Sequence, residues 1–88
     1  MVVYKLVFTK RAIKDIEFLR QANLITKAKK LTEILKSNPF QNPPPFEKLT
    51  GDLTGLYSRR INIQHRLVYE IFENEKTIKI IRMWKHYE

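Results

Sequence analysis

The sequence RLVYEIFENEKTIKIIRMWKHY, residues 66–87, has the pattern of a β-hairpin. Residues 66–72 and 77–87 are rich in β-branched and aromatic side chains, which favour strands. The four polar residues between them, 73–76, are typical of a hairpin turn. Residues 56–61 have the same strand character and precede the hairpin. The second half of the chain is therefore predicted to form a three-stranded antiparallel meander.

The first half predicts one strand and two helices. Residues 2–8 are β-branched and aromatic with little charge, which favours a strand. Thr9 is a suitable N-cap, and apolar residues recur after it at helical spacing over 12–19. A second amphipathic helix extends from Leu24 to Ser37–Asn38, because the proline that follows disfavours helical geometry before it. The order β-α-α-β-β-β predicts an α+β fold, an antiparallel sheet with two N-terminal helices packed on one face.

Residues 41–55 separate the helices from the meander. They include three consecutive prolines, Pro43–Pro45, and two glycines, and they show no clear period. This composition predicts a long loop that the prolines stiffen in an extended form. Such a loop is suited to holding a side chain in place.

Composition limits the class of protein. The 88 residues predict a single domain, 1–88. Seventeen Lys and Arg against nine Asp and Glu give a net charge of +8, which favours polyanionic partners, nucleic acid first and an acidic protein second. The absence of cysteine excludes disulfides and thiolate metal sites and favours the cytoplasm. No apolar run approaches the roughly 18 residues of a membrane span, so no membrane association is expected.

The last three predicted strands and their ends concentrate positive charge. The cationic residues there include Arg59, Arg60, Arg66, Arg82, Lys85 and His86. Two helices can cover only one face of the sheet, so part of this charge must face solvent or a ligand. Aromatic residues beside it, Tyr57, Trp84 and Tyr87, would allow such a face to hold phosphates and stack bases.

The chain has no metal-ligand spacing and no glycine-rich phosphate loop. Cleaving RNA without a metal requires a base for the ribose 2′-hydroxyl, cations for the charge on phosphorus, and an acid for the departing 5′ oxygen. Glu47, Arg66 and His86 are of the right types for these roles. Each also has a plainer interpretation: a solvated loop carboxylate, a structural salt-bridge donor and an ordinary tail residue. As a base, Glu47 would need a raised pKa, which an adjacent arginine opposes and burial favours.

A family resemblance favours the catalytic interpretation of Glu47, Arg66 and His86 over the plainer one. Residues 46–71, FEKLTGDLTGLYSRRINIQHRLVYEI, resemble the YoeB/Txe branch of the RelE-type toxins. The most distinctive segments are LTGLYSRRI at 53–61 and HRLVY at 65–69. The NPF of residues 38–40 and the terminal His86-Tyr87 also match. The resemblance covers essentially the whole chain, and its second half carries most of the specificity.

The resemblance implies a bacterial toxin that binds the A site of the 70S ribosome and cleaves mRNA there without a metal or cofactor. A cognate antitoxin would hold it inactive, and a homodimer within that complex is possible. The implied catalytic residues are Glu47 as general base, Arg66 as transition-state stabiliser and His86 as general acid. The implied RNA-binding residues are Arg59, Arg60, Tyr87 and Lys48.

Some features depart from the family pattern. Tyr57 stands where relatives often have tryptophan, Thr50 stands where a lysine is common, and the chain continues past the terminal motif to Glu88. With a two-residue turn, Arg66 would pair with residue 83 and would lie on the face opposite His86, unless a bulge shifts the register. Two alternatives to catalysis stay open: a degenerate toxin that only binds RNA or antitoxin, and a structural partner of an acidic protein.

Overall fold

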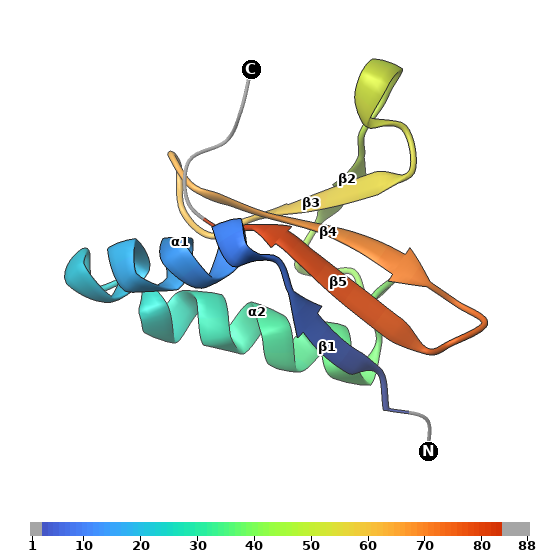
Figure 1. The fold of residues 1–88 in the computed structure, drawn as a ribbon, viewed down its shortest axis with the longest axis horizontal. Helices are drawn as coiled ribbons and strands as arrows, with labels where there is room; N and C mark the ends of the chain where they lie inside the picture. The colour runs from blue at the N-terminus through green and yellow to red at the C-terminus, as the bar shows by residue number, and fades with distance from the viewer. Residues whose placement is uncertain (1–2, 84–88) are drawn as a thin grey trace.

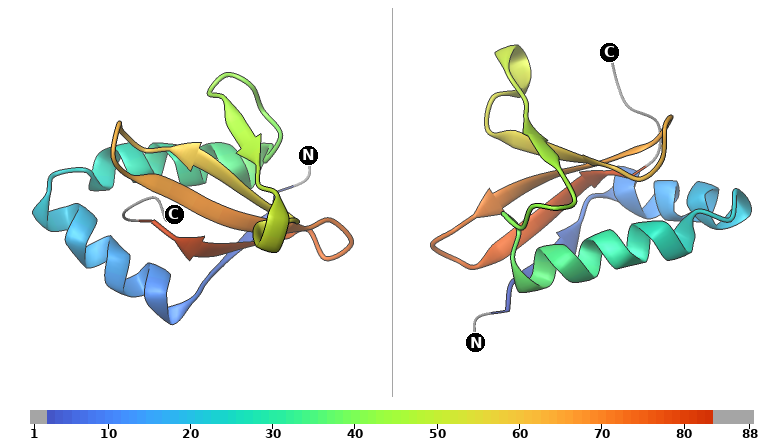
Figure 2. Two further views of the ribbon diagram at one scale, coloured as in Figure 1. Left: turned by 90° about the horizontal axis from the view of Figure 1, so that it is seen from above. Right: turned by 180° about the vertical axis from the view of Figure 1, so that it is seen from behind.

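The computed structural model of the chain describes residues 3–83. Two helices pack on one face of a five-stranded sheet, with the strand order β1-β5-β4-β3-β2 (Figures 1 and 2). Along the chain the elements are β1 (Lys5–Phe8), α1 (Lys10–Gln21), α2 (Ile25–Ser37), β2 (Phe46–Lys48), a short 3-10 helix (Gly51–Leu53), β3 (Leu56–Arg60), β4 (Arg66–Phe72) and β5 (Thr77–Arg82). The α+β class is confirmed. Of the predicted last strand, residues 84–87 lie outside the described part of the chain.

The sheet is mixed, which corrects the prediction of an antiparallel sheet. The meander β3-β4-β5 is antiparallel as expected, but β1 pairs in parallel with β5, from Lys5 opposite Thr77 to Phe8 opposite Ile80. Sequence pattern identifies a strand but not the direction of a partner so far along the chain, which explains the error.

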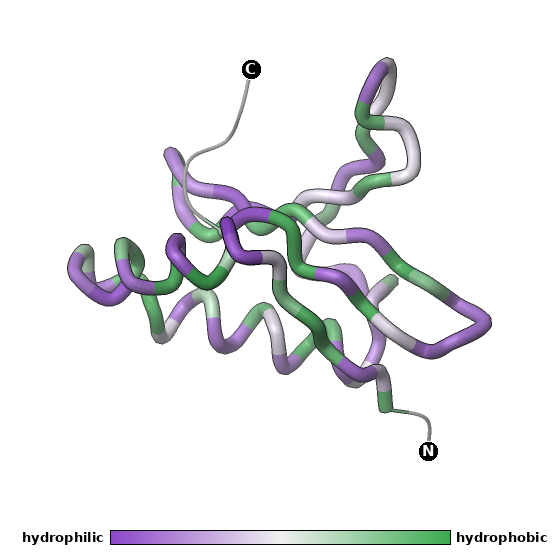
Figure 3. Tube along the Cα trace, viewed as in Figure 1, coloured by the Kyte–Doolittle hydropathy of each residue, from purple (hydrophilic) through white to green (hydrophobic). Residues whose placement is uncertain are grey.

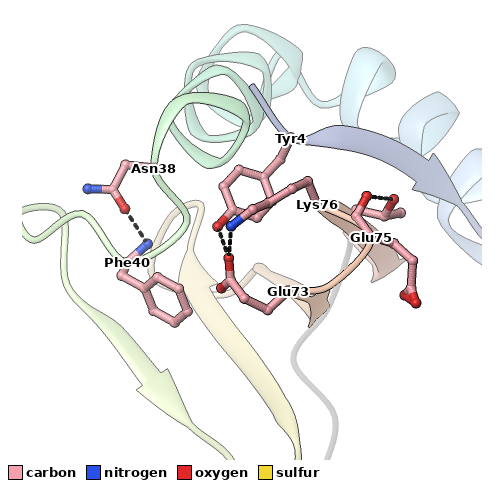
Figure 4. A network of polar contacts seen from close by, with 7 residues as sticks. Tyr4, Asn38, Phe40, Glu73, Glu75 and Lys76 are labelled. Atoms are coloured by element: carbon pink, nitrogen blue, oxygen red, sulfur yellow. Dashed lines mark hydrogen bonds and ion pairs between the residues drawn. The ribbon is translucent and has the colours of Figure 1, made fainter. Parts of the chain in front are cut away.

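A side chain of the β4–β5 turn hydrogen-bonds to Tyr4, which directly precedes β1, and holds the start of β1 beside β5. The Tyr4 hydroxyl and the Lys76 ammonium both donate to Glu73 Oε1, the latter at 2.5 Å (Figure 4). The backbone N–H of Lys5 also donates to the carbonyl of Lys76 at 2.8 Å. These contacts place the first residues of β1 beside the first residues of β5, so the two strands run in the same direction.

The predicted loop at 41–55 contains a strand that sequence pattern did not reveal. Strand β2 pairs antiparallel with β3, with Phe46 opposite Arg59 and Glu47 opposite Ser58. Three residues are too few to establish a period of two, so this strand carries no signal of its own. The correction matters because Glu47 is fixed by a sheet pairing rather than by a loop.

Both helices place apolar stripes on the sheet. The N-cap prediction is confirmed, since the Thr9 hydroxyl accepts from Ala12 N–H at 3.0 Å. Hydrophobic and hydrophilic residues intermix along α1 and α2 (Figure 3). The core between helices and sheet includes Leu19, Leu31, Leu35, Leu67, Tyr69, Ile78 and Ile80. Burying each such side chain contributes about 1.5–3 kcal/mol. Neither α1 nor α2 is long and apolar enough to cross a membrane, and no other helix of residues 3–83 is either.

A register shift interrupts the pairing of β4 with β5. Phe72 lies opposite Thr77, and Tyr69 lies opposite Ile80, but Val68 lies opposite Arg82. Ile81 is the extra residue, and the shift is a β-bulge. The expected pairing of Arg66 with residue 83 is therefore wrong: beyond the bulge, Arg66, Val68 and Arg82 share one face of the sheet. The bulge removes the pairing on which the expected conflict between Arg66 and His86 rested. His86 and Tyr87 lie outside the described residues.

Candidate active site

The candidate site lies on the open face of the sheet, which we define as the face away from α1 and α2. In β4, Leu67 and Tyr69 belong to the helix-covered core, so Arg66 and Val68 point to the open face. The register places the partners of these two residues on the same face: Arg60 opposite Arg66, and Ser58 opposite Val68. Strand β2 adds Glu47 opposite Ser58. Three neighbouring strands, β2, β3 and β4, thus contribute polar side chains to one surface.

Glu47 and Arg66 are in direct contact on this face. Arg66 Nη1 donates to Glu47 Oε1 at 2.6 Å and to Ser58 Oγ at 3.1 Å. The side chain of Glu47 is 64% exposed and that of Arg66 is 24% exposed, so the pair is accessible from solvent. The structure therefore brings together two of the three predicted catalytic residues. The third, His86, lies outside the described residues.

The contact with Arg66 lowers the pKa of the Glu47 carboxyl. The hydrogen bond from Arg66 lowers the pKa of the Glu47 carboxyl, the charge of Arg66 lowers it further, and Arg60 contributes a smaller effect, while partial desolvation opposes them. Glu47 is thus ionised near neutrality and able to accept a proton. Its basicity is reduced as long as Arg66 is bound to it. An exposed ion pair contributes only about 0–1 kcal/mol of stability, so an anionic ligand can exchange for the carboxylate at small cost.

Arg59 and Arg60 are neighbours in sequence but lie on opposite faces of the sheet. Arg60 is exposed on the open face, where an RNA contact is sterically possible. Arg59 is only 1% exposed. Its guanidinium donates to Tyr69 Oη at 3.1 Å, and to the carbonyls of Pro44 at 2.6 Å and Pro39 at 2.9 Å.

Arg59 therefore does not fit the predicted RNA contact, because its side chain is enclosed and its donors are used internally. The guanidinium also lies 4.9 Å from the centre of the Phe46 ring, a cation–π distance. Phe46 precedes Glu47 in β2 and packs against Tyr57, with ring centres 6.0 Å apart. Arg59 holds the proline loop and β2 in place, and it supports the position of Glu47 from behind the sheet.

The other predicted RNA-binding residues have separate positions. Lys48 is exposed and pairs with Tyr57, so it lies on the face opposite Glu47. Tyr87 and the aromatic Trp84 lie outside the described residues. Within residues 3–83, no group of three His, Asp or Glu side chains is arranged to hold a metal ion.

Sequence reasoning missed Ser58 as a member of this site. Ser58 is only 2% exposed and accepts a hydrogen bond from Arg66. A small polar residue at a buried strand position was the available signal. Ser58 and Glu47 both accept hydrogen bonds from the Arg66 guanidinium, and together they orient it.

The chain is similar to known proteins in both sequence and fold. The sequence profile of a family described as YoeB-like toxin of bacterial type II toxin-antitoxin system matches residues 8–87. Toxin YoeB of Synechocystis sp. is 36% identical over 74 residues, which cover 84% of this chain and 77% of that protein. The solved YoeB/ParE toxin from Agrobacterium tumefaciens superposes with a TM-score of 0.85 at 34% identity, covering 94% of this chain and 99% of the other.

Two further solved structures are from Staphylococcus aureus. One is a YoeB-YefM complex, in which the matched chain has a TM-score of 0.80 at 34% identity and covers 96% of this chain and 98% of its own. The other is a YoeB dimer, with a TM-score of 0.81 at 32% identity, covering 98% of this chain and all of the other. The similarity thus extends from the sequence to the arrangement of helices and strands.

Proposed function

Because the chain belongs to the family of YoeB-like toxins of bacterial type II toxin–antitoxin systems, we propose that it is an endoribonuclease that cleaves mRNA in the ribosomal A site. The observation that carries the proposal is the contact between Arg66 and Glu47 on the open face. A base and a cation at hydrogen-bond distance suit a reaction in which a hydroxyl is deprotonated next to a phosphate.

The reaction needs no metal or cofactor. Glu47 takes the proton of the ribose 2′-hydroxyl, and the resulting oxygen attacks the adjacent phosphorus. Arg66 stabilises the additional negative charge on the phosphate oxygens. His86 donates a proton to the 5′ oxygen as its bond to phosphorus breaks. The products are a 2′,3′-cyclic phosphate and a 5′-hydroxyl, so atoms and charges balance.

Substrate binding weakens the interaction with Arg66 that lowers the pKa of Glu47. An incoming phosphate competes with the carboxylate for the Arg66 guanidinium, which can bind a phosphate through two parallel N–H groups. Once Arg66 has moved to the phosphate, the interaction that lowers the pKa of Glu47 weakens, and Glu47 becomes a stronger base. Glu47 is thus a weak base in the free protein, and RNA binding raises its basicity.

The remaining contacts follow from the same proposal. Arg60 and Tyr87 orient the RNA, and the net charge of +8 favours association with the ribosome. A cognate antitoxin neutralises the protein in the cytoplasm, by analogy with the YoeB-YefM complex of Staphylococcus aureus. Residues 1–88 act as one domain. A homodimer within that complex is proposed on the precedent of the YoeB dimer.

A binding module without catalysis is the second candidate. It is favoured by one observation, the ion pair that lowers the pKa of Glu47 and so weakens it as a base. Such a protein would occupy the ribosome and block translation without cutting the message.

Induced expression with and without the antitoxin gene, followed by primer-extension mapping of mRNA ends, separates the two. The enzyme predicts new 5′ ends within codons of translated messages. Glu47→Ala, Arg66→Ala and His86→Ala should each remove these ends and relieve growth arrest, while circular dichroism shows an intact fold. Glu17→Ala, which changes an exposed acid on α1, is the matched control and should stay toxic. Arrested translation with uncut message would support the binding module, and full toxicity of all three variants would refute the catalytic assignment.

A further inference from the structure

The N-terminus of α1 is bonded to the bulge of β5. The Thr9 hydroxyl donates to the carbonyl of Ile81 at 2.9 Å, and it accepts from Ala12 N–H as the helix N-cap. The backbone N–H of Thr9 donates to the carbonyl of Ile80 at 3.1 Å. One residue thus joins the start of the helix to the residue that shifts the strand register.

A buried acid on α1 holds the next part of the chain. Asp15 is 1% exposed, and its Oδ2 accepts from Met83 N–H at 3.1 Å. Arg11 lies 3.8 Å from its other oxygen, but the side chain of Arg11 is 61% exposed. A carboxylate facing a core is costly to bury, so this position would favour an apolar residue if only packing mattered. The carboxylate instead binds the backbone of the first residue after β5.

These two contacts fix where the C-terminal segment begins. The bulge at Ile81 decides which residues share the face of Arg66, and Met83 is three positions before His86. Three residues span at most about 10 Å, so the position and direction of Met83 limit where His86 can act. We propose that Thr9 and Asp15 are positioning residues for the general acid His86, which they serve by holding Ile81 and Met83. This inference rests on the proposed function.

The test compares two substrates under single-turnover conditions, each a short mRNA bound to ribosomes with an empty A site. One has an ordinary phosphodiester at the cleaved linkage, and the other has sulfur in place of its bridging 5′ oxygen. A thiolate leaves without being protonated, so the second substrate needs no general acid. Asp15→Ala and Thr9→Val should slow the ordinary cleavage by roughly tenfold to a hundredfold, and both should cleave the sulfur linkage at nearly the wild-type rate.

Conservative variants isolate the hydrogen bonds. Asp15→Asn keeps a carbonyl oxygen that can accept from Met83 N–H, and Thr9→Ser keeps the hydroxyl, so both should retain most of the ordinary activity. Glu17→Ala alters an exposed acid on the same helix and should cleave both substrates like the wild type. Thermal unfolding confirms the fold of each variant. Thr9→Val keeps the shape of the side chain, so it carries the test if Asp15→Ala does not fold.

The outcomes separate this inference from the function on which it rests. Equal slowing on both substrates in the Asp15 and Thr9 variants, with recovery of His86→Ala on the sulfur linkage, would overturn the positioning role alone. Failure of His86→Ala to recover on the sulfur linkage would overturn the general-acid assignment itself. The expected result is that Asp15→Ala, Thr9→Val and His86→Ala all cleave the sulfur linkage at nearly the wild-type rate. Glu47→Ala should be slow on both substrates.

Discussion

Arg66 Nη1 lies 2.6 Å from Glu47 Oε1, although the two residues are 19 positions apart in the chain. Two antiparallel pairings produce this contact, β2 with β3 and β3 with β4, and Ser58 is the shared neighbour. Both residues lie within residues 46–71, the stretch that carries most of the family resemblance. It also makes the basicity of Glu47 depend on what else Arg66 binds.

Replacing Arg66 with methionine should raise the pKa of Glu47 toward its ordinary value of about 4.3. The hydrogen bond and the charge of Arg66 are the two largest causes of the lowered pKa, and both are lost in this variant. Carbon-13 NMR titration of the glutamate carboxyl groups measures the change. Arg60→Met should raise the same pKa by a smaller amount. An unchanged Glu47 midpoint in Arg66→Met would mean that the pair does not persist in solution.

The adjacent arginines of β3 should respond to substitution in opposite ways. Arg59→Met leaves buried acceptors on Pro39, Pro44 and Tyr69 without their donor, so the free energy of unfolding should fall by about 3 kcal/mol. Arg60→Met changes an exposed side chain and should alter stability by less than about 0.5 kcal/mol, while reducing RNA cleavage. Urea unfolding and cleavage assays on both variants measure the difference.

The opposite pattern for these two variants would reverse the assignment. A stable Arg59→Met protein with lost cleavage would show that Arg59 reaches the RNA after a rearrangement. A destabilised Arg60→Met protein would show that Arg60 is part of the packing.

The sequence predicted the two helices and the meander. It predicted the rest of the sheet and the candidate site only in part, for different physical reasons. The elements with several turns or alternations, such as α1 and β4, were predicted closely because their periods repeat. Strand β2 was missed because three residues do not establish a period. The direction of β1 was wrong because contacts near Tyr4 and Glu73, far apart in sequence, determine it.

Within the site, the residue types were predictable but their faces were not. Motif resemblance identified Glu47 and Arg66, and the structure places them in contact. The same motif suggested equal roles for Arg59 and Arg60, although alternation along a strand places neighbouring residues on opposite faces. The single-residue bulge at Ile81 changes which residues share a face, and no composition rule predicts its position.

Replacing Ser58 with alanine should lower kcat for cleavage by about tenfold, because Arg66 loses one of its two acceptors on the open face. The predicted cost to the free energy of unfolding is small, about 1 kcal/mol, since one hydrogen bond is removed without a large cavity. Single-turnover cleavage measures the first quantity and urea unfolding the second. A kcat equal to that of the wild type would show that Glu47 alone orients Arg66.

The contacts of Glu73 at the far end of the hairpin should make stability depend on pH. Hydrogen bonds from Lys76 and Tyr4 lower the pKa of Glu73, and Glu73 in turn raises the pKa values of Lys76 and Tyr4. A lowered pKa contributes stability above the unfolded value of about 4.3, and this stability is lost as the pH falls through the folded value. The raised pKa values contribute below about 10, and their contribution is lost as the pH rises through the folded values.

Glu73→Gln should therefore be less stable than the wild type near pH 7, and the difference should shrink in both acid and alkaline solution. Urea unfolding midpoints measured across this range give the profile. Glu75→Gln is the matched control, because Glu75 is an exposed acid in the same turn, and it should follow the wild type. RNA cleavage should be unchanged in both variants, since the turn is at the opposite end of β4 from Arg66. A constant difference between Glu73→Gln and the wild type at all pH values would show that the charge of Glu73 plays no part in holding β1 to the turn.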